Sequence, residues 1–270
     1  MSLSVSGKTA IVTGAAHGIG LAVARHLVDK GARVMFADLD ETALEAELGE
    51  EARGEGAVRM FAGDLTQKLT IANLLSATVD AFDRVDILVN ASRRCVPSEP
   101  LNPETDGVEM LWQQNLMTAL RMSQMTARRM IAAAEKAEVE PGTPIGAIVN
   151  ISSLAATRAQ PGLLGYSIAS AAVEQMTRSM ALELADKGIR VNAVSFASVM
   201  SASLHGALKE NPGWREQIAA GTPMGRIAGP DELAETVQYL ASDASRFVTG
   251  QVITVDGGRG LLDRVDAPAF

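Results

Sequence analysis

The sequence lacks the features of secreted, membrane and nucleic-acid-binding proteins. Its 270 residues include one cysteine, Cys95, which excludes an internal disulfide. The N-terminal residues MSLSVSGK lack the apolar segment of a secretory signal, and no apolar run approaches the roughly 18 residues of a membrane span. Lys and Arg number 24 against 32 Asp and Glu, so the net charge is −8 and no basic stripe can neutralise phosphates. We therefore expect a cytoplasmic protein that binds neither nucleic acid nor membranes.

The composition suits one large α/β domain. Apolar residues make up 47% of the chain, which is enough for a sizeable core. The chain has no internal repeat, low-complexity tract or break in composition. We therefore expect one domain over residues 1–270, in which residues 261–270 form a C-terminal tail.

Short apolar runs alternate with helical patterns along the chain. Several of these runs are apolar on both faces, as are strands that helices cover on both sides. The alternation predicts a single-domain Rossmann fold, whose doubly wound parallel sheet of about seven strands binds ligands beyond the carboxyl ends of its strands. Residues 198–221 are expected to be a mobile segment. The expected strands are residues 9–13, 33–37, 58–62, 86–90, 147–151, 189–194 and 251–255, and the expected helices include residues 41–48, 67–82, 105–136, 164–187 and 230–241.

The two longest helical patterns, residues 105–136 and 164–187, have more apolar surface than one face of a sheet needs. Five methionines lie in the first of them. Thioethers commonly fill irregular apolar gaps, so we interpret these methionines as core or subunit packing and infer no metal site. The excess apolar surface predicts a homo-oligomer.

A glycine loop, TGAAHGIG, lies between the first expected strand and the helix that follows it. Gly14 can make the tight turn, Gly18 can let the backbone approach a pyrophosphate, and Gly20 can permit close helix packing. The helix N-terminus then offers oriented N–H groups to phosphates. The alternative is an ordinary strand-to-helix turn that happens to contain three glycines.

Two aspartates follow the second and third expected strands. Asp38 lies 18 residues after Gly20, close to the roughly 20 expected of an acid that binds the adenosine ribose. A carboxylate there accepts hydrogen bonds from the ribose hydroxyls and repels a 2′-phosphate, so we expect NAD rather than NADP. Asp38 could also cap the next helix. Asp64 could be a turn residue or an adenine contact.

The stretch between Asn150 and Ala172 brings together groups that can transfer a proton. Ser153 is expected just beyond the strand that ends at Ile151, and Tyr166 near the start of a helix, so that a hydroxyl and a phenol could share one substrate oxygen. One helical turn after the tyrosine stands Ser170, where a cation would help this chemistry most.

These motifs, together with Asn115 and the C-terminal VTGQVITVDGG, resemble the classical short-chain dehydrogenase/reductase family over roughly residues 6–258. The resemblance implies a dinucleotide-binding catalytic domain. In it Ser153 would hold the substrate oxygen, Tyr166 would transfer its proton and Asn115 would support a water relay. It also implies that the long helices pair across a dimer axis, often within a homotetramer. The implied cofactor-binding residues are Gly14, His17, Gly18, Ile19, Gly20, Asp38, Asp64, Leu65 and Asn90.

The sequence departs from the family pattern around the reaction site. Ser170 replaces the lysine that binds the nicotinamide ribose and acidifies the tyrosine. The NNAG turn reads NASR at residues 90–93, and Phe196 and Ala197 replace a Pro-Gly pair. The adenine side is nearly intact, so the sequence supports cofactor binding more firmly than turnover.

Without a nearby cation, roughly one tyrosine in a thousand is ionised at pH 7, whereas a cation within about 4–6 Å lowers a tyrosine pKa by some 1–3 units. Arg93 or Arg94 could supply the missing charge or obstruct the nicotinamide half. Alternatively, both side chains point to solvent, as long arginines usually do, and we expect this third arrangement. We interpret Cys95 as a small filler rather than a nucleophile.

The leading functional hypothesis is an NAD(H)-dependent oxidoreductase that interconverts a secondary alcohol and a ketone, with activity impaired by Ser170. The alternative is a weak or inactive member of the family that binds nucleotide as a sensor or partner subunit. A third reading keeps the enzyme but changes the reaction to elimination or isomerisation. Residues 158–165 and 198–221 are expected to line the substrate site and carry no diagnostic pattern.

Overall fold

A seven-stranded parallel sheet forms the centre of the protein, in a computed structural model that describes residues 3–263. The strand order is β3-β2-β1-β4-β5-β6-β7, which confirms the predicted doubly wound Rossmann fold. The order reverses between β1 and β4, and a sheet of this kind binds ligands at that point. The strands are β1 (Thr9–Thr13), β2 (Arg33–Asp38), β3 (Val58–Ala62), β4 (Ile87–Asn90), β5 (Gly146–Ser153), β6 (Ile189–Phe196) and β7 (Val252–Val255).

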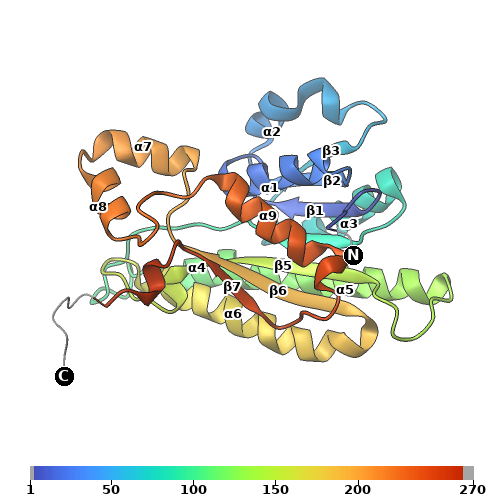
Figure 1. The fold of residues 1–270 in the computed structure, drawn as a ribbon. Coiled ribbons are helices and arrows are strands. Elements are labelled where there is room, and N and C mark those ends of the chain that lie inside the picture. The colour runs from blue at the N-terminus through green and yellow to red at the C-terminus, as the bar shows by residue number, and fades with distance from the viewer. Residues whose placement is uncertain (1–2, 264–270) are drawn as a thin grey trace.

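Helices cover both faces of the sheet (Figure 1). In this view α1, α2 and α9 lie above the sheet, α4, α5 and α6 lie below it, and α7 and α8 stand at the left, beyond the strand ends. None of the helices in residues 3–263 combines the length and apolar character that crossing a membrane requires. The helices are α1 (Gly18–Asp29), α2 (Glu41–Leu48), α3 (Lys68–Phe82), α4 (Val108–Leu111), α5 (Thr118–Lys136), α6 (Leu164–Leu184), α7 (Ala202–Glu210), α8 (Trp214–Ala220) and α9 (Pro230–Ala241).

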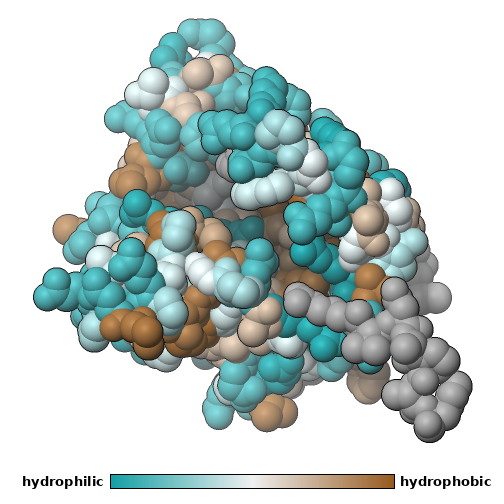
Figure 2. Space-filling model, turned by 90° about the vertical axis from the view of Figure 1, so that its left-hand side faces the viewer, coloured by the Kyte–Doolittle hydropathy of each residue, from teal (hydrophilic) through white to brown (hydrophobic). Residues whose placement is uncertain are grey.

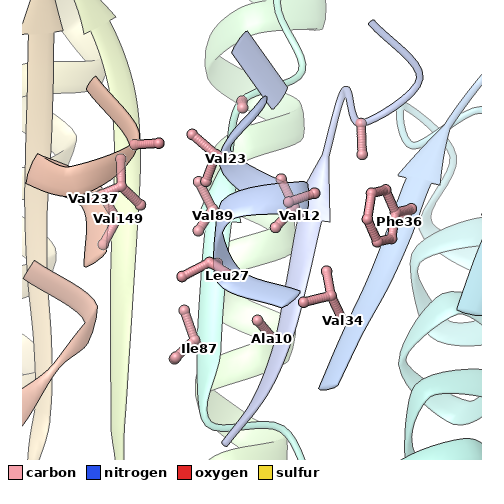
Figure 3. Close-up of a cluster of buried hydrophobic side chains, with 14 of the residues drawn as sticks. Ala10, Val12, Val23, Leu27, Val34, Phe36, Ile87, Val89, Val149 and Val237 are labelled. Carbon is pink, nitrogen blue, oxygen red and sulfur yellow. The ribbon is translucent and has the colours of Figure 1, made fainter. Parts of the chain in front are cut away.

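Alternate residues of each strand enter different hydrophobic cores. Val12 of β1 packs in the core beneath α1 and α9, where it meets Val23 and Leu27 (Figure 3). Its neighbour Ile11 belongs to the core on the other face, with Ile71 of α3. Successive side chains of a strand point to opposite faces, so strands that are apolar throughout require two helical layers.

The long helix expected over residues 105–136 begins three residues later, at Val108. Gly107 has a left-handed backbone (φ 70°), which no helix interior accepts, and the Asp106 carboxylate accepts a hydrogen bond from the Val108 N–H. A π-helical segment, Trp112–Met117, then joins α4 to α5. This insertion changes which side chains face the sheet and was not visible in the apolar periodicity.

Two further predictions differ from the structure at the carboxyl edge. Strand β5 continues to Ser153, because its last residues pair with β6 up to Ser153 opposite Phe196. Residues 198–221 contain two helices, α7 and α8, and the Ser201 hydroxyl caps the first by accepting from the Leu204 N–H. Of the tail expected at residues 261–270, residues 264–270 lie outside the described part.

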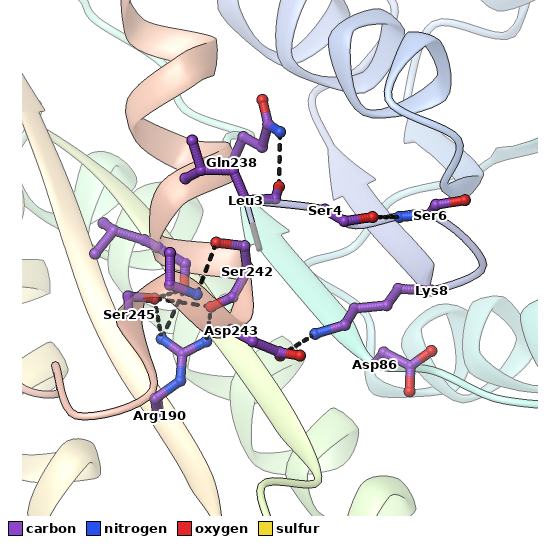
Figure 4. A network of polar contacts seen from close by, with 12 residues as sticks. Leu3, Ser4, Ser6, Lys8, Asp86, Arg190, Gln238, Ser242, Asp243 and Ser245 are labelled. Carbon is purple, nitrogen blue, oxygen red and sulfur yellow. Dashed lines mark hydrogen bonds and ion pairs between the residues drawn. The ribbon is translucent and has the colours of Figure 1, made fainter. Parts of the chain in front are cut away.

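A polar network ties the N-terminal segment to α9 and to the start of β6 (Figure 4). The buried Arg190 guanidinium donates to the Leu240 and Ser242 carbonyls at 2.7 and 3.0 Å, at the C-terminal end of α9. Desolvation lowers the pKa of Arg190. Lys8 pairs with Asp243 at 2.6 Å. Because these contacts lie at the amino end of the strands, they stabilise the fold away from the carboxyl edge.

Candidate active site

A large cleft opens at the carboxyl edge of the sheet, on the face that Figure 2 shows hollowed at its centre. It extends from Ile19, in the first turn of α1, to Ser153 and Tyr166 at the ends of β5 and the start of α6. Helix α8 contributes Trp214 to its wall. The predicted phosphate-binding turn and the predicted proton-transfer residues therefore share one cleft.

The glycine loop is shaped by close backbone approaches. Gly14 has φ +67°, and a Cβ there would lie 2.7 Å from the Ser92 Cα in the loop after β4. A Cβ on Gly20 would overlap the Gly14 carbonyl oxygen. At Gly18, by contrast, the nearest heavy atom to such a Cβ is the Ser201 Cβ at 3.8 Å, so the space in front of the helix is open. No side chain caps the N-terminus of α1, which leaves its N–H groups for a phosphate.

Asp38 lies half-buried at the end of β2, and backbone N–H groups fix its carboxylate. Its two oxygens accept from Ala16 at 3.0 Å and from Asp40 at 3.1 Å. The alternative that Asp38 caps α2 is wrong, because the Asp40 side chain is the cap and accepts from the Ala43 N–H. His17 is exposed and lies 3.2 Å from the Asp40 carboxylate. The hydrogen bond from Ala43 and that from His17 lower the pKa of Asp40.

The other expected cofactor residues lie in different surroundings. Asp64 is exposed and accepts from the hydroxyl and the N–H of Thr66, and these bonds lower the pKa of its carboxyl. It is therefore a turn residue, while Leu65 beside it is buried. The Asn90 amide donates to Ser123 at 3.0 Å and to Asn150 at 2.8 Å, so its side chain braces β4 against its neighbours.

Ser153 and Tyr166 both line the cleft. The Ser153 hydroxyl accepts from the Ala155 N–H at 3.2 Å, and its own proton remains available to a ligand. The neighbouring Ser152 hydroxyl donates instead to the buried Glu174 carboxylate at 3.1 Å. Of the two serines, Ser153 is the one that lines the cleft.

Arg93 contacts the tyrosine directly, so the expectation that its side chain points to solvent is wrong. Its Nη1 donates to the Tyr166 hydroxyl oxygen at 2.5 Å and to the Ser152 carbonyl at 3.3 Å. Its guanidinium carbon lies 4.2 Å from the centroid of the Phe196 ring. Arg94 is exposed, as expected. Arg93 and Phe196 thus meet beside the phenol.

Hydrogen bonds on both sides of Arg93 explain its inward direction. The Thr13 hydroxyl accepts from the N–H groups of Ala91 and Ser92 at 3.1 and 3.0 Å. The Asn115 amide accepts from the Arg94 N–H and donates to the Arg94 carbonyl, both at 2.8 Å. Asn115 therefore fixes this loop. The role of Thr13 was missed, since a threonine at a strand end carries no specific signal.

Ser170 is buried and lines a small inner cavity behind Tyr166 and Arg93, together with Asn90 and Asn115. This cavity has a volume of about 10 Å³, roughly that of one water molecule. Cys95 is exposed and lines the large cleft, so it does not fill packed space as the sequence interpretation expected. Partial burial raises the pKa of the Cys95 thiol, and the positive charge of Arg93 offsets only part of this effect. The raised pKa disfavours a nucleophilic thiolate.

Comparison with known proteins identifies the family. The model of the enoyl-(acyl carrier protein) reductase family matches residues 14–259. A 2,3-dihydroxy-2,3-dihydro-p-cumate dehydrogenase of Pseudomonas putida is 33% identical over 97% of both chains. This chain belongs to the short-chain dehydrogenase/reductase family. A cis-4-hydroxycyclohexanecarboxylate dehydrogenase of Sinomonas cyclohexanicum is 35% identical over 93% of this chain and 96% of its own.

Solved structures of this family superpose on nearly the whole chain. A gluconate 5-dehydrogenase from Burkholderia cenocepacia in complex with NADP and tartrate has a TM-score of 0.83 and 28% identity, covering 97% of this chain and 98% of its own. A 7α-hydroxysteroid dehydrogenase complexed with NADH and 7-oxo glycochenodeoxycholic acid has a TM-score of 0.84 and 28% identity, covering 95% of both. As a member of the short-chain dehydrogenase/reductase family, the protein is an oxidoreductase.

Proposed function

We propose that the protein interconverts a secondary alcohol and a ketone with NAD(H). The observation that carries this proposal is the single cleft that joins the first turn of α1, at Ile19, to Ser153 and Tyr166. The open space at Gly18 and the uncapped N-terminus of α1 fit a dinucleotide pyrophosphate. When bound, the nicotinamide supplies or accepts the hydride.

The chain's own residues handle the substrate oxygen. Ser153 donates a hydrogen bond to this oxygen and polarises it. Tyr166 gives its proton to the oxygen during ketone reduction and takes a proton from the alcohol during oxidation. Asn115 acts through its two hydrogen bonds to Arg94, which hold the loop beside the tyrosine.

The preference for NAD rests on Asp38. Its carboxylate is fixed at the end of β2 by Ala16 and Asp40, where it can accept hydrogen bonds from ribose hydroxyls and repel a 2′-phosphate. The next residue, Leu39, is 72% exposed and offers no charge to a phosphate. Both NADP and NADH occur in the related structures, so this local charge is what favours NAD here.

The substrate is proposed to carry an apolar body and a carboxylate. Trp214 and Ile218 line an apolar wall of the cleft, and Arg158 and Arg259 lie in the same lining, where Asp263 is the one acid among the described residues. Arg158 donates to the Gly260 carbonyl and Arg259 to a serine hydroxyl. The related enzyme named for cis-4-hydroxycyclohexanecarboxylate has a substrate of this kind.

We further propose a cytoplasmic homo-oligomer, a dimer or a tetramer. Apolar side chains along α6 are left exposed, including Leu182 at 83%, Ile168 at 39% and Leu164 at 38%. A second copy of this chain could cover them. A monomeric mass in solution, measured by light scattering, would refute the assembly.

The test is an NADH fluorescence titration followed by turnover with two matched ketones, 4-oxocyclohexanecarboxylate and 4-methylcyclohexanone. We expect NADH to bind more tightly than NADPH, and the carboxylate to be reduced with the lower KM. Arg158→Gln should raise the KM for the carboxylate alone. Failure to bind NADH at millimolar concentration would sink the proposal. Binding without turnover of any ketone would favour the nucleotide-binding partner subunit.

A further inference from the structure

We propose that Arg93 is the catalytic cation of this enzyme and acts on Tyr166 from the loop after β4. This inference rests on the proposed oxidoreductase function and deepens it. The guanidinium nitrogen lies 2.5 Å from the Tyr166 oxygen, in direct hydrogen-bond contact with it. The residue one helical turn beyond Tyr166, Ser170, brings no charge.

The chemistry of the step requires a positive charge at this oxygen. In ketone reduction the carbonyl carbon receives hydride from the reduced cofactor, and the carbonyl oxygen receives the proton of Tyr166. The products are the alcohol, the oxidised cofactor and a phenolate. A neighbouring guanidinium stabilises the phenolate more than the neutral phenol, so it also stabilises the state that leads to it.

The direction of the hydrogen bond suits proton transfer. A guanidinium can only donate, so the Tyr166 oxygen accepts from Arg93 and keeps its own proton. Both residues line the cleft that also contains Ser153. The phenol can therefore present its proton to a substrate oxygen while the cation remains bound to it.

The guanidinium is held in place before any substrate arrives. It stacks on Phe196 at 4.2 Å and donates to the Ser152 carbonyl at 3.3 Å. Before Arg93 in the chain, the Thr13 hydroxyl holds the two preceding residues. After it, the Asn115 amide holds the backbone of Arg94. Such preorganised charge is effective because it needs no reorganisation during the reaction.

The buried carboxylate beside this site is bound by another arginine. The nearby buried carboxylate, Glu174, is paired with Arg178 at 3.5 Å and accepts from the Ser152 hydroxyl. The charge of Arg93 therefore acts on the phenol, which is its polar side-chain partner.

The decisive experiment compares Arg93→Gln, which keeps amide donors without the charge, with Arg93→Lys. For Arg93→Gln we expect kcat for ketone reduction to fall roughly ten- to thousandfold, as loss of a neighbouring cation implies. The alcohol-oxidation profile should move to higher pH, with the Kd for NADH changed less than threefold. Arg93→Lys should recover part of the loss. An unchanged kcat and pH profile would overturn the proposal.

A double variant, Arg93→Gln with Ser170→Lys, tests whether a cation on α6 can take over. The inner cavity at Ser170 has a volume of only about 10 Å³, so the lysine stem would also use the space that the Arg93 side chain vacates. Asn90, which lines this cavity, has a side-chain oxygen without a partner among the described residues. We expect kcat to rise at least tenfold over Arg93→Gln. If Arg93 is instead a plug over the cofactor site, Arg93→Gln alone should tighten NADH binding and raise kcat, and the proposal would be wrong.

A measurement without cofactor separates this inference from the proposed function. The chain has two tyrosines, Tyr166 and Tyr239, so in a Tyr239→Phe background the ultraviolet absorbance of tyrosinate reports Tyr166 alone. We expect tyrosinate to appear at lower pH with Arg93 than with Arg93→Gln. Coinciding titrations would overturn the cation role even if ketones are reduced. If the two titration curves differ but no ketone is reduced, the effect of Arg93 on Tyr166 stands and the proposed oxidoreductase reaction is wrong.

Discussion

The two halves of the carboxyl edge are built to hold their ligands in different ways. Where β1 and β2 end, the working parts are backbone: a left-handed Gly14, the open front of α1 and the N–H groups that orient Asp38. Where β4, β5 and β6 end, they are side chains, and Arg93 from a loop, Tyr166 from α6 and Phe196 from the end of β6 meet there. A site built from the backbone requires glycine at particular positions of the chain. A positive charge, by contrast, can be brought to a phenol by a side chain from any neighbouring element. The first half can therefore keep its pattern while the second is rearranged.

The largest effect should come from Tyr166→Phe, which removes the reacting hydroxyl and keeps the ring in its buried position. We expect kcat to fall about 10²- to 10⁴-fold, the usual contribution of a positioned acid or base. The Kd for NADH should stay within threefold, because the β1 and β2 half is untouched. A large loss of NADH binding would break the distinction between the two halves.

The reciprocal variant, Gly20→Ala, alters the half of the edge where β1 and β2 end. Its Cβ would overlap the Gly14 carbonyl oxygen, so the loop must shift. Overpacking of this kind destabilises by about 1–3 kcal/mol, and we expect the Kd for NADH to rise roughly 10- to 100-fold. Gly206→Ala is the matched control, because no heavy atom lies within 4 Å of its added Cβ. Equal NADH affinity in the two variants would contradict the proposed cofactor site.

Asp38→Asn should change which cofactor is used with a smaller effect on how fast it reacts. The amide keeps one acceptor oxygen for the two backbone N–H groups that hold the carboxylate, and it no longer repels a 2′-phosphate. We expect the ratio of kcat/KM for NADH to that for NADPH to fall about tenfold, equivalent to about 1.4 kcal/mol. An unchanged ratio would show that discrimination lies elsewhere.

Asn115→Ala should lower kcat by roughly three- to tenfold, because two hydrogen bonds to the Arg94 backbone are lost. The effect depends on the loop that carries Arg93. In an Arg93→Gln background the same substitution should change kcat less than twofold. Additive losses in this double-mutant cycle would mean that Asn115 acts on the reaction by another route.

Glu232→Gln should have the smallest effect and leave both halves unchanged. Its carboxylate binds Arg226 at 2.6 Å, and that bond lowers the pKa of Glu232 to about 2 from an ordinary 4.5. A depressed carboxyl pKa stabilises the fold above about pH 4.5, and this contribution is lost between about pH 4.5 and 2. For so exposed a pair it is less than about 1 kcal/mol. The difference in Tm between Glu232→Gln and wild type should be smaller at pH 3 than at pH 7. A difference that does not change with pH would show that it does not arise from the pair of Glu232 and Arg226.

The sequence predicts the sheet well because each strand is a short apolar run followed by a turn and a helix. It mislocates the start of the long helix because Gly107 adopts a left-handed conformation that apolar periodicity does not report. It also misses α7 and α8, whose weakly apolar residues give little period to detect.

At the reaction site the sequence predicts the spacing of Ser153 and Tyr166 because both lie on regular elements that begin or end nearby. The direction of Arg93 is different. It depends on hydrogen bonds that the loop backbone donates to Thr13 and Asn115, which lie 80 and 22 residues from Arg93 in the sequence and which only the fold brings close to it. The general tendency of arginines to face solvent therefore could not predict that Arg93 points inward.

The loop that carries Arg93 has one further consequence. Residues 91–99 form neither helix nor strand, whereas a lysine on α6 would be fixed to a rigid rod. Positive charge at Tyr166 is therefore conditional on where this loop stands. A change in the residues that hold this loop, such as Thr13, would displace the charge and slow proton transfer although the reacting groups themselves are unchanged.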